Sequence, residues 1–364
     1  MKIVSIVGAR PQFIKCAPVS VLLRKEHEEI LVHTGQHYDP EMSDIFFEDL
    51  RIPRPDYHLE VGSGSHGWQT AAILEKTEGV LVKEMPDFVI VYGDTNSTLA
   101  GAVAAAKLHI PVAHVEAGLR SFDRTMPEEI NRVVTDHVSD LLLCPTQTAV
   151  DNLAKEGIIR GVHLVGDVMV DALKFNADLA ERKSRIINQL GLKKGNYFVA
   201  TVHRPGNTDD KKNLTAIIDA FRESGEIVVF PLHPRTRKYL REYGLLDSLP
   251  GNILCIDPVG YIDMLHLMKH AKKILTDSGG IQKEAYVMGI PCITLRENTE
   301  WIETLTGGWN VLVGADKQKI LAAISAGEQT TADNTVFGKG DAAERIIRVL
   351  TTACKSADLF KPAG

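Results

Sequence analysis

The chain has 364 residues, of which 44% are hydrophobic, 24% charged and 6% aromatic. This composition is typical of a globular protein, and it excludes disordered, collagen-like and membrane-spanning classes. The formal net charge is −6. Because a mildly acidic chain has no general basic field, we expect no nucleic-acid partner.

The five cysteines are scattered and never spaced as Cys-x-x-Cys, which favours reduced thiols over disulfides or a zinc site. The first apolar run ends at Gly8, too soon for a signal peptide or a membrane span. We therefore expect a cytoplasmic protein that does not associate with membranes.

In the first half, short runs rich in Val and Ile alternate with segments of helical period. This rhythm predicts a parallel sheet covered on both faces. The expected strands are residues 3–7, 30–33, 88–92, 112–115 and 141–144, and the expected helices are 12–25, 42–50, 67–83, 98–108 and 128–138.

A second series of the same kind follows a polar helical connector at residues 171–190. Its expected strands are 197–201, 227–231, 253–256, 274–276 and 292–295, with helices at 213–224, 261–269 and 281–288. We therefore expect two α/β domains, at residues 1–168 and 169–345, followed by a C-terminal segment at 346–364. If the domains face each other, the carboxyl ends of both sheets meet at one cleft, where ligands of open α/β sheets bind.

The most informative stretch runs from a strand through Ser278-Gly279-Gly280 into a helix. Two glycines let the backbone approach a ligand, and the amides and dipole of the helix start favour a phosphate. Glu284, one turn further on, could accept hydrogen bonds from ribose hydroxyls. The alternative is an ordinary tight turn that Ser278 caps.

Basic residues follow three other strands. Arg10 ends the first strand and Lys15 lies on the next helix, where they could grip a pyrophosphate or be two solvated charges. In the second half, His203-Arg204 and His233-Pro234-Arg235 end two strands. They would present imidazole and guanidinium to a diphosphate, although a single such His more often packs or is solvated.

Acidic residues close the strands of the first half. Asp94 and Glu116 each follow a strand, and Glu128 lies four residues before Arg132 on the same helix face. If the three carboxylates converge, they suit proton abstraction and donation on two sides of a substrate. The alternative is that Asp94 caps its helix and Glu128 complements a helix dipole.

Two further motifs suggest ligands, and we interpret neither as a site. The Gly-x-Gly-x-x-Gly pattern at residues 62–67 follows an alternating segment rather than a buried strand, so we expect no nicotinamide or flavin. His266 and His270 have the spacing of two metal ligands on a helix, but no third ligand is evident in the sequence, so we expect no metal.

Taken together, the chain closely resembles the non-hydrolysing UDP-N-acetylglucosamine (UDP-GlcNAc) 2-epimerases, from the first strand to about Leu312. The motifs that carry this resemblance are Gly8-Ala9-Arg10-Pro11 with Ile14-Lys15, Tyr92-Gly93-Asp94-Thr95, His114-Val115-Glu116-Ala117-Gly118-Leu119-Arg120, Pro127-Glu128-Glu129-Ile130-Asn131-Arg132, Thr201-Val202-His203-Arg204, Pro231-Leu232-His233-Pro234-Arg235 and Thr276-Asp277-Ser278-Gly279-Gly280-Ile281-Gln282-Lys283-Glu284.

The resemblance implies a GT-B fold of two Rossmann-like domains, with the C-terminal segment crossing back to the first, and a homodimer. It implies conversion of UDP-GlcNAc to UDP-N-acetylmannosamine (UDP-ManNAc) through a 2-acetamidoglucal, without cofactor or metal. UDP would be held by Ser278, Gly279, Gly280 and Glu284, with Arg10, His203 and His233 near the diphosphate. The catalytic set would be Lys15, Asp94, Glu116, Glu128, Arg132 and His203.

The chain departs from the family pattern at a few positions. Gly206 and Gln12 stand where Glu is usual. Gln36 and His37 match residues that bind an activating second UDP-GlcNAc, but the helix at residues 69–72 lacks the accompanying cation, so we expect no such activation. The rival readings are a hydrolysing epimerase that releases free sugar, a GT-B glycosyltransferase that needs an acceptor, and a nucleotide-sugar sensor.

Overall fold

The computed structural model describes residues 1–36, 53–327 and 335–355. The expected helix at 42–50 and the candidate His37 therefore lie outside the described residues, as does the side chain of Arg10. The chain forms two compact units, one of Met1–Ala172 with Thr335–Gly364, the other of Leu173–Asn334.

These unit boundaries differ from the expected breaks after residues 168 and 345. The first turn of helix α7 (Val168–Lys183) stays with the first unit because Asp171 accepts hydrogen bonds from the amides of Ala342 and Ala343, at 3.2 and 3.0 Å. The chain also returns to the first unit before residue 345, since Asp167 N donates to the carbonyl of Phe337 at 2.8 Å.

The first unit is a doubly wound α/β domain. Its parallel sheet has the strand order β3-β2-β1-β4-β5-β6-β7. The five expected strands are present, and the sequence missed β3 and β7 because they have only two and three residues. The strands are β1 (Lys2–Val7), β2 (Glu28–His33), β3 (Tyr57–His58), β4 (Phe88–Tyr92), β5 (Val112–Val115), β6 (Leu141–Cys144) and β7 (Val162–Leu164).

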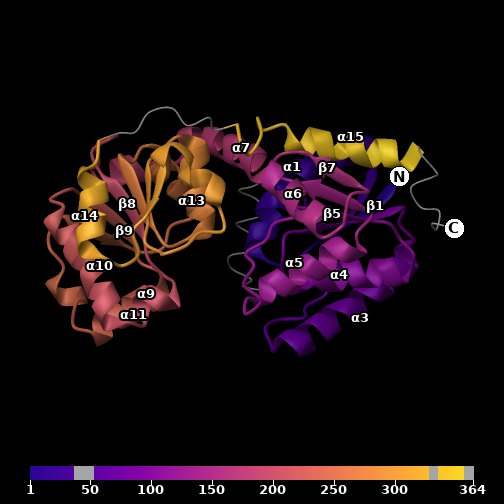
Figure 1. The fold of residues 1–364 in the computed structure, drawn as a ribbon, viewed down its shortest axis with the longest axis horizontal. Helices are drawn as coiled ribbons and strands as arrows, with labels where there is room; N and C mark the ends of the chain where they lie inside the picture. The colour runs from indigo at the N-terminus through magenta and orange to yellow at the C-terminus, as the bar shows by residue number, and fades with distance from the viewer. Residues whose placement is uncertain (37–52, 328–334, 356–364) are drawn as a thin grey trace. The chain divides into compact units, whose positions relative to one another are not determined.

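Helices cover both faces of this sheet. Figure 1 shows α3 and α4 on one face, and α15 running along α1 on the other. Val4, Ile6, Val89 and Val91 of the strands pack against Ile73 of α3 in one buried core. The helices are α1 (Arg10–Glu26), α3 (His66–Glu84), α4 (Asn96–Lys107), α5 (Pro127–Val138), α6 (Gln147–Lys155) and α15 (Ala342–Lys355).

The second unit repeats the design with a parallel sheet in the order β10-β9-β8-β11-β12-β13. Its strands are β8 (Phe198–Thr201), β9 (Val228–Pro231), β10 (Ile253–Ile256), β11 (Lys273–Thr276), β12 (Cys292–Thr294) and β13 (Asn310–Leu312). Its helices are α8 (Ile186–Gln189), α9 (Pro205–Thr208), α10 (Lys211–Glu223), α11 (Pro234–Glu242), α12 (Tyr261–Lys269), α13 (Gly279–Met288) and α14 (Lys317–Ser325), with 3-10 turns at Leu246–Ser248 and Ile302–Gly308.

The expected connector helix at 171–190 is two helices rather than one. Helix α7 ends at Lys183, and Ser184 turns the chain by donating to Asp263 at 2.6 Å and accepting from the amide of Ile186 at 3.3 Å. Serine competes for backbone hydrogen bonds in this way, which is why it ends helices.

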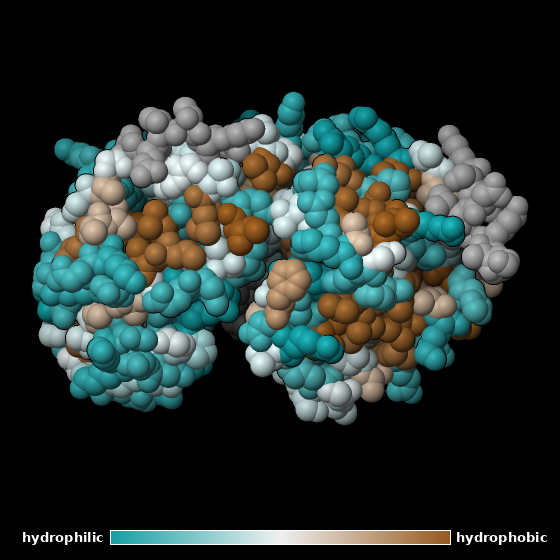
Figure 2. Space-filling view, viewed as in Figure 1, coloured by the Kyte–Doolittle hydropathy of each residue, from teal (hydrophilic) through white to brown (hydrophobic). Residues whose placement is uncertain are grey.

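The described residues contain no helix long and apolar enough to span a bilayer. On the face that Figure 2 shows, apolar patches lie among hydrophilic residues in both units. In each unit the strands are parallel, so the loops that follow them gather at one edge of the sheet, the edge where ligands of open α/β sheets bind. The expected two Rossmann-like halves are thus confirmed.

Candidate functional site

In the first unit, a buried ion pair joins the loops that follow β1 and β5. Lys15 of α1 pairs with Glu116, and their side chains are 12% and 6% exposed. A Cβ on Gly93 would lie 3.4 Å from an atom of each partner, so the pair sits against the turn after β4. Glu116 has φ +76°, a left-handed conformation that costs a residue with a side chain roughly 1–3 kcal/mol and that gathers at active sites.

A second ion pair fixes Asp94, the residue after that turn. Arg132 Nη2 donates to Asp94 at 2.6 Å and Nη1 to Glu129 at 2.9 Å. Burial alone would lower the pKa of Arg132, but Asp94 and Glu129 outweigh it and raise that pKa. Asn131 also donates to the carbonyl of Asp94, at 3.0 Å. The structure therefore brings Asp94 and Arg132 together, two residues of the predicted catalytic set.

We expected Glu128 to converge with Asp94 and Glu116, but it takes no part in their ion pairs. It is exposed on the first turn of α5, and no hydrogen bond or ion pair of its side chain is found among the described residues. Arg132 bonds to the neighbouring Glu129 instead, which is buried and accepts from the amides of Ser121 and Phe122 at 2.8 and 3.1 Å. Burial raises the pKa of Glu129, and these bonds outweigh burial and lower it.

Gln12, one of the departures from the family pattern, is a buried link between two site loops. Its Oε1 accepts from the amides of Gly8 and Ala9 at 2.8 and 3.0 Å. Its Nε2 donates to the carbonyl of Tyr92 at 2.7 Å and to Thr98 Oγ1 at 3.0 Å. The amide therefore ties the turn before Lys15 to the turn before Asp94.

A buried network of charged side chains supports these turns, and we did not predict it from the sequence. Asp136 of α5 is buried and accepts from the guanidinium of Arg120 at 2.7 Å, and Arg120 also binds Glu156 at 2.7 and 2.8 Å. Burial raises the pKa of Asp136, whereas His114 and Arg120 outweigh burial and lower it. The signal in the sequence was the run of polar residues on a helix that covers a buried sheet.

In the second unit, the buried carboxylate of Asp277 joins two site loops. It follows β11 and accepts from the amides of His203 and Arg204, which follow β8, at 3.0 and 2.9 Å. Asn207 Nδ2 adds a third bond at 3.0 Å. Asp277 belongs to one of the motifs found in the sequence, but we predicted no role for it. It holds the His203 loop beside the Ser278-Gly279-Gly280 turn.

That turn leads into α13, whose first amides have no partner within the helix. Ser278 occupies the cap position but makes no capping hydrogen bond through its side chain. A Cβ on Gly279 would lie 1.9 Å from Glu300, whereas one on Gly280 would meet only Ser278 Oγ, at 4.0 Å. Glu284 is buried and accepts from the hydroxyl of Tyr261 at 3.1 Å.

The two candidate histidines of this unit lie together, with ring centroids 5.6 Å apart. His233 Nδ1 accepts from the amide of Arg235 at 3.2 Å, so the ring caps α11. Burial, then His203 and Arg235, lower the pKa of His233. Gly206 has open space around its Cβ position, so the departure there removes a side chain without a packing consequence.

The first unit has paired charges at the carboxyl edge of its sheet, and the second has a helix start whose amides lack partners within the helix. Together the two doubly wound sheets define a two-domain α/β enzyme of the GT-B type. The family model described as UDP-N-acetylglucosamine 2-epimerase matches residues 21–351. The chain belongs to this family.

Three relatives illustrate the likeness. The chain is 58% identical to a UDP-N-acetylglucosamine 2-epimerase homolog of Methanococcus maripaludis, over 96% of this chain and 99% of that one. It is 49% identical to the UDP-2,3-diacetamido-2,3-dideoxy-D-glucuronate 2-epimerase of Pseudomonas aeruginosa, with the same coverage. The crystal structure of the Methanocaldococcus jannaschii UDP-GlcNAc 2-epimerase with UDP-GlcNAc and UDP matches with a TM-score of 0.85 and 46% identity, over 97% of this chain and 100% of that one.

Proposed function

We propose that this enzyme interconverts UDP-GlcNAc and UDP-ManNAc by eliminating and re-adding UDP through a 2-acetamidoglucal. The observation that carries the proposal is the pair of carboxylates at one sheet edge, Glu116 beside Lys15 and Asp94 beside Arg132. The Methanocaldococcus jannaschii relative, whose structure is named as a complex with UDP-GlcNAc and UDP, supports the choice of substrate.

The proposed chemistry explains why both cations and acids are present. The proton on sugar carbon 2 is not acidic, so removing it directly would leave an unstabilised carbanion. If the bond from carbon 1 to UDP breaks first, an oxocarbenium-like state makes that proton easy to lose. One carboxylate then takes the proton and another returns it on the opposite face as UDP adds back.

We assign the nucleotide to the second unit. The free amides at the start of α13 and the glycines at 279 and 280 suit a phosphate, and Glu284 suits the ribose hydroxyls. His203 and His233 would stabilise the departing diphosphate. Stabilisation of a leaving group by groups held in place contributes several kcal/mol, on the order of 3, in a dry site.

The test is incubation of the purified enzyme with UDP-GlcNAc in deuterated water, followed by NMR of the products. We expect deuterium at carbon 2 of both UDP-GlcNAc and UDP-ManNAc. Free N-acetylmannosamine with UDP would instead identify a hydrolysing epimerase. If UDP-GlcNAc stays unchanged on its own and is consumed only after an acceptor is added, the protein is a glycosyltransferase.

We further propose that Asp94, Glu116 and Glu128 share the proton transfers. Replacing each by its amide and following deuterium uptake separately from epimerisation assigns the face on which each acts. The exposed Glu75 of α3 offers a matched control, Glu75→Gln, which we expect to retain full activity. Full activity in all three site variants would refute the assignment.

A second candidate substrate is UDP-2,3-diacetamido-2,3-dideoxy-D-glucuronate. The observation that favours it is the 49% identity to the Pseudomonas aeruginosa enzyme named for that sugar, against 47% to the named Methanocaldococcus jannaschii UDP-GlcNAc 2-epimerase. Both sugars share the 2-acetamido group and the UDP that the mechanism needs. The kcat/KM values for the two substrates, measured side by side, decide between them.

We also propose that the enzyme is a homodimer. We propose that it works in a reducing compartment and that its product is an activated sugar for polysaccharide synthesis. The five cysteines are unpaired, in line with such a compartment. Apolar Trp68, Val82 and Met85 of the α3 region are 53%, 60% and 79% exposed, which a second copy of the chain could cover. Sedimentation of the wild type and of Met85→Glu tests the dimer, since a monomeric wild type would contradict it.

A further inference from the structure

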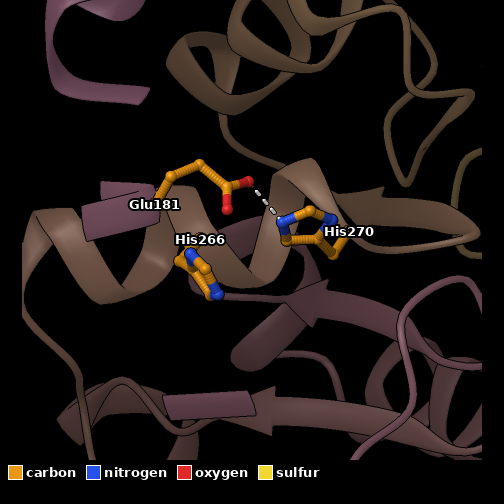
Figure 3. A group of neighbouring side chains, drawn as sticks. All are labelled: Glu181, His266 and His270. Atoms are coloured by element: carbon orange, nitrogen blue, oxygen red, sulfur yellow. Dashed lines mark hydrogen bonds and ion pairs between the residues drawn. The ribbon is translucent and has the colours of Figure 1, made fainter. Parts of the chain in front are cut away.

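A cluster of metal-ligand side chains lies in the second unit, on elements to which the proposed reaction gives no role. Glu181 comes from the last turn of α7, His266 from α12, and His270 from the residue that ends α12. One donor atom from each lies within 4.8 Å of the other two. Figure 3 shows the carboxylate of Glu181 beside the two rings, with a bond to His270.

His266 is the buried member of this cluster. The residue is only 6% exposed. Its Nδ1 is buried and has no hydrogen-bond partner among the described residues. A buried ring nitrogen with no hydrogen-bond partner loses the solvation it would have in water, and a bound metal ion would replace that loss.

The other two donors, Glu181 and His270, already contact the ammonium group of Lys194. Glu181 lies 2.5 Å from Nε2 of His270, and Lys194 Nζ lies 2.9 Å from the same nitrogen and 3.6 Å from the Glu181 carboxylate. Lys269 Nζ is 3.4 Å from that carboxylate. The Lys194 side chain is 56% exposed on a flexible stem, so its ammonium can leave the cluster at little cost.

We propose that Glu181, His266 and His270 bind a divalent transition-metal ion, with zinc as the best fit, in exchange for the ammonium of Lys194. Two imidazoles four residues apart on a helix and one carboxylate are a donor set that zinc prefers. Glu181 and His270 are 33% and 17% exposed, so the ion can enter and retain a water ligand. The ion would fasten the end of α7 to α12.

The sequence could not supply this site, because Glu181 is far from the two histidines along the chain. The fold brings it to them through the contact of α7 with α12, where Leu173 and Ala180 pack against Ile262 and Leu265.

The experiment is a zinc titration of the metal-stripped full chain, by calorimetry or by competition with a coloured chelator. We expect one equivalent bound by the wild type, and at least about tenfold weaker binding by Glu181→Gln, His270→Gln and His266→Gln, since one lost ligand costs more than 1.4 kcal/mol. His137→Gln, at an exposed histidine of α5, is the matched control. Lys194→Met should bind zinc more tightly, because it removes the competing ammonium.

Cobalt gives a second readout, because a site of two imidazoles and a carboxylate produces visible absorption that the variants should lack. Zinc should also raise the unfolding temperature of the wild type but not of Glu181→Gln. Zinc affinity equal to that of the wild type in Glu181→Gln and His270→Gln, which are partly exposed and expected to fold, would overturn the proposal. These measurements need no turnover, so they are independent of the epimerase assignment.

Discussion

Nδ1 of His114 lies 2.6 Å from Oδ1 of Asp136, and both side chains are fully buried. The other ring nitrogen lies 2.7 Å from the carbonyl of Gly93. The ring therefore bridges the buried carboxylate of Asp136 to the turn after β4. Asp136 also accepts from the amide of Gly118 at 3.1 Å. These buried contacts of His114 and Asp136 thus link Gly93, which precedes Asp94, to Gly118, which follows Glu116.

Asp136→Asn should lower the free energy of unfolding at pH 7 by about 3–5 kcal/mol, because it takes the buried carboxylate from the ring of His114 and from the guanidinium of Arg120, which then keeps only Glu156 as its counter-charge. The folded protein lowers the pKa of this carboxyl, so its contribution is present above the unfolded pKa of about 3.9 and is lost as the pH falls through the folded pKa. Urea unfolding at pH 7 and in acid measures this. Asp151→Asn, at an exposed site of α6, is the control. A wild-type advantage that stays constant into acid would contradict the assignment.

Gln12→Leu should destabilise the first unit by about 2 kcal/mol or more. The replacement has a similar volume but leaves the amides of Gly8 and Ala9 without their buried acceptor, and it removes one of the two side-chain donors to the carbonyl of Tyr92. Thermal and urea unfolding report the loss. Gln189→Leu, at an exposed position of α8, should change stability by less than about 0.5 kcal/mol. Equal effects of the two changes would show that the link between the turns does not matter.

Asp277→Asn should weaken UDP binding by about tenfold or more, equivalent to 1.4 kcal/mol. The carboxylate accepts hydrogen bonds from two amides and from Asn207, and an amide side chain would point a donor at one of these donors. Calorimetry with UDP measures the effect. The exposed Asp247→Asn should bind UDP as the wild type does. If Asp277→Asn kept full affinity, the loop after β8 would have no part in holding UDP.

Two neighbouring glycines should respond differently to the same change. Gly279→Ala should cost about 1–3 kcal/mol of stability, because the added methyl group would lie 1.9 Å from Glu300, which Arg296 holds in an ion pair of 2.9 Å. Gly280→Ala has open space and should keep the wild-type stability while weakening UDP binding. Parallel unfolding and binding curves test both. Full UDP affinity in Gly280→Ala would argue against a phosphate on the start of α13.

The pattern of apolar runs sufficed to predict the sheets, because buried parallel strands must be nearly all apolar. It failed at β3, β7 and β13, which have only two or three residues, since so few positions carry little pattern. It also could not foresee the break at Ser184, which depends on a partner, Asp263, that only the tertiary structure supplies.

The site showed the same division. Side chains that follow strands directly, such as Asp94 and Glu116, could be found from the sequence, because parallel strands end at one edge. The choice between Glu128 and Glu129 as the partner of Arg132 could not, since it depends on which face of α5 is buried. Residues that support the site from behind, such as Gln12, need the fold to reveal their partners.

Asp277 holds its neighbouring loop chiefly through main-chain amides, and this affects how the enzyme could be altered. A loop whose shape does not depend on its own side chains can accept new ones without collapsing. Libraries that vary position 204 should therefore yield a high share of folded enzymes, because Asp277 holds this residue through its main-chain amide.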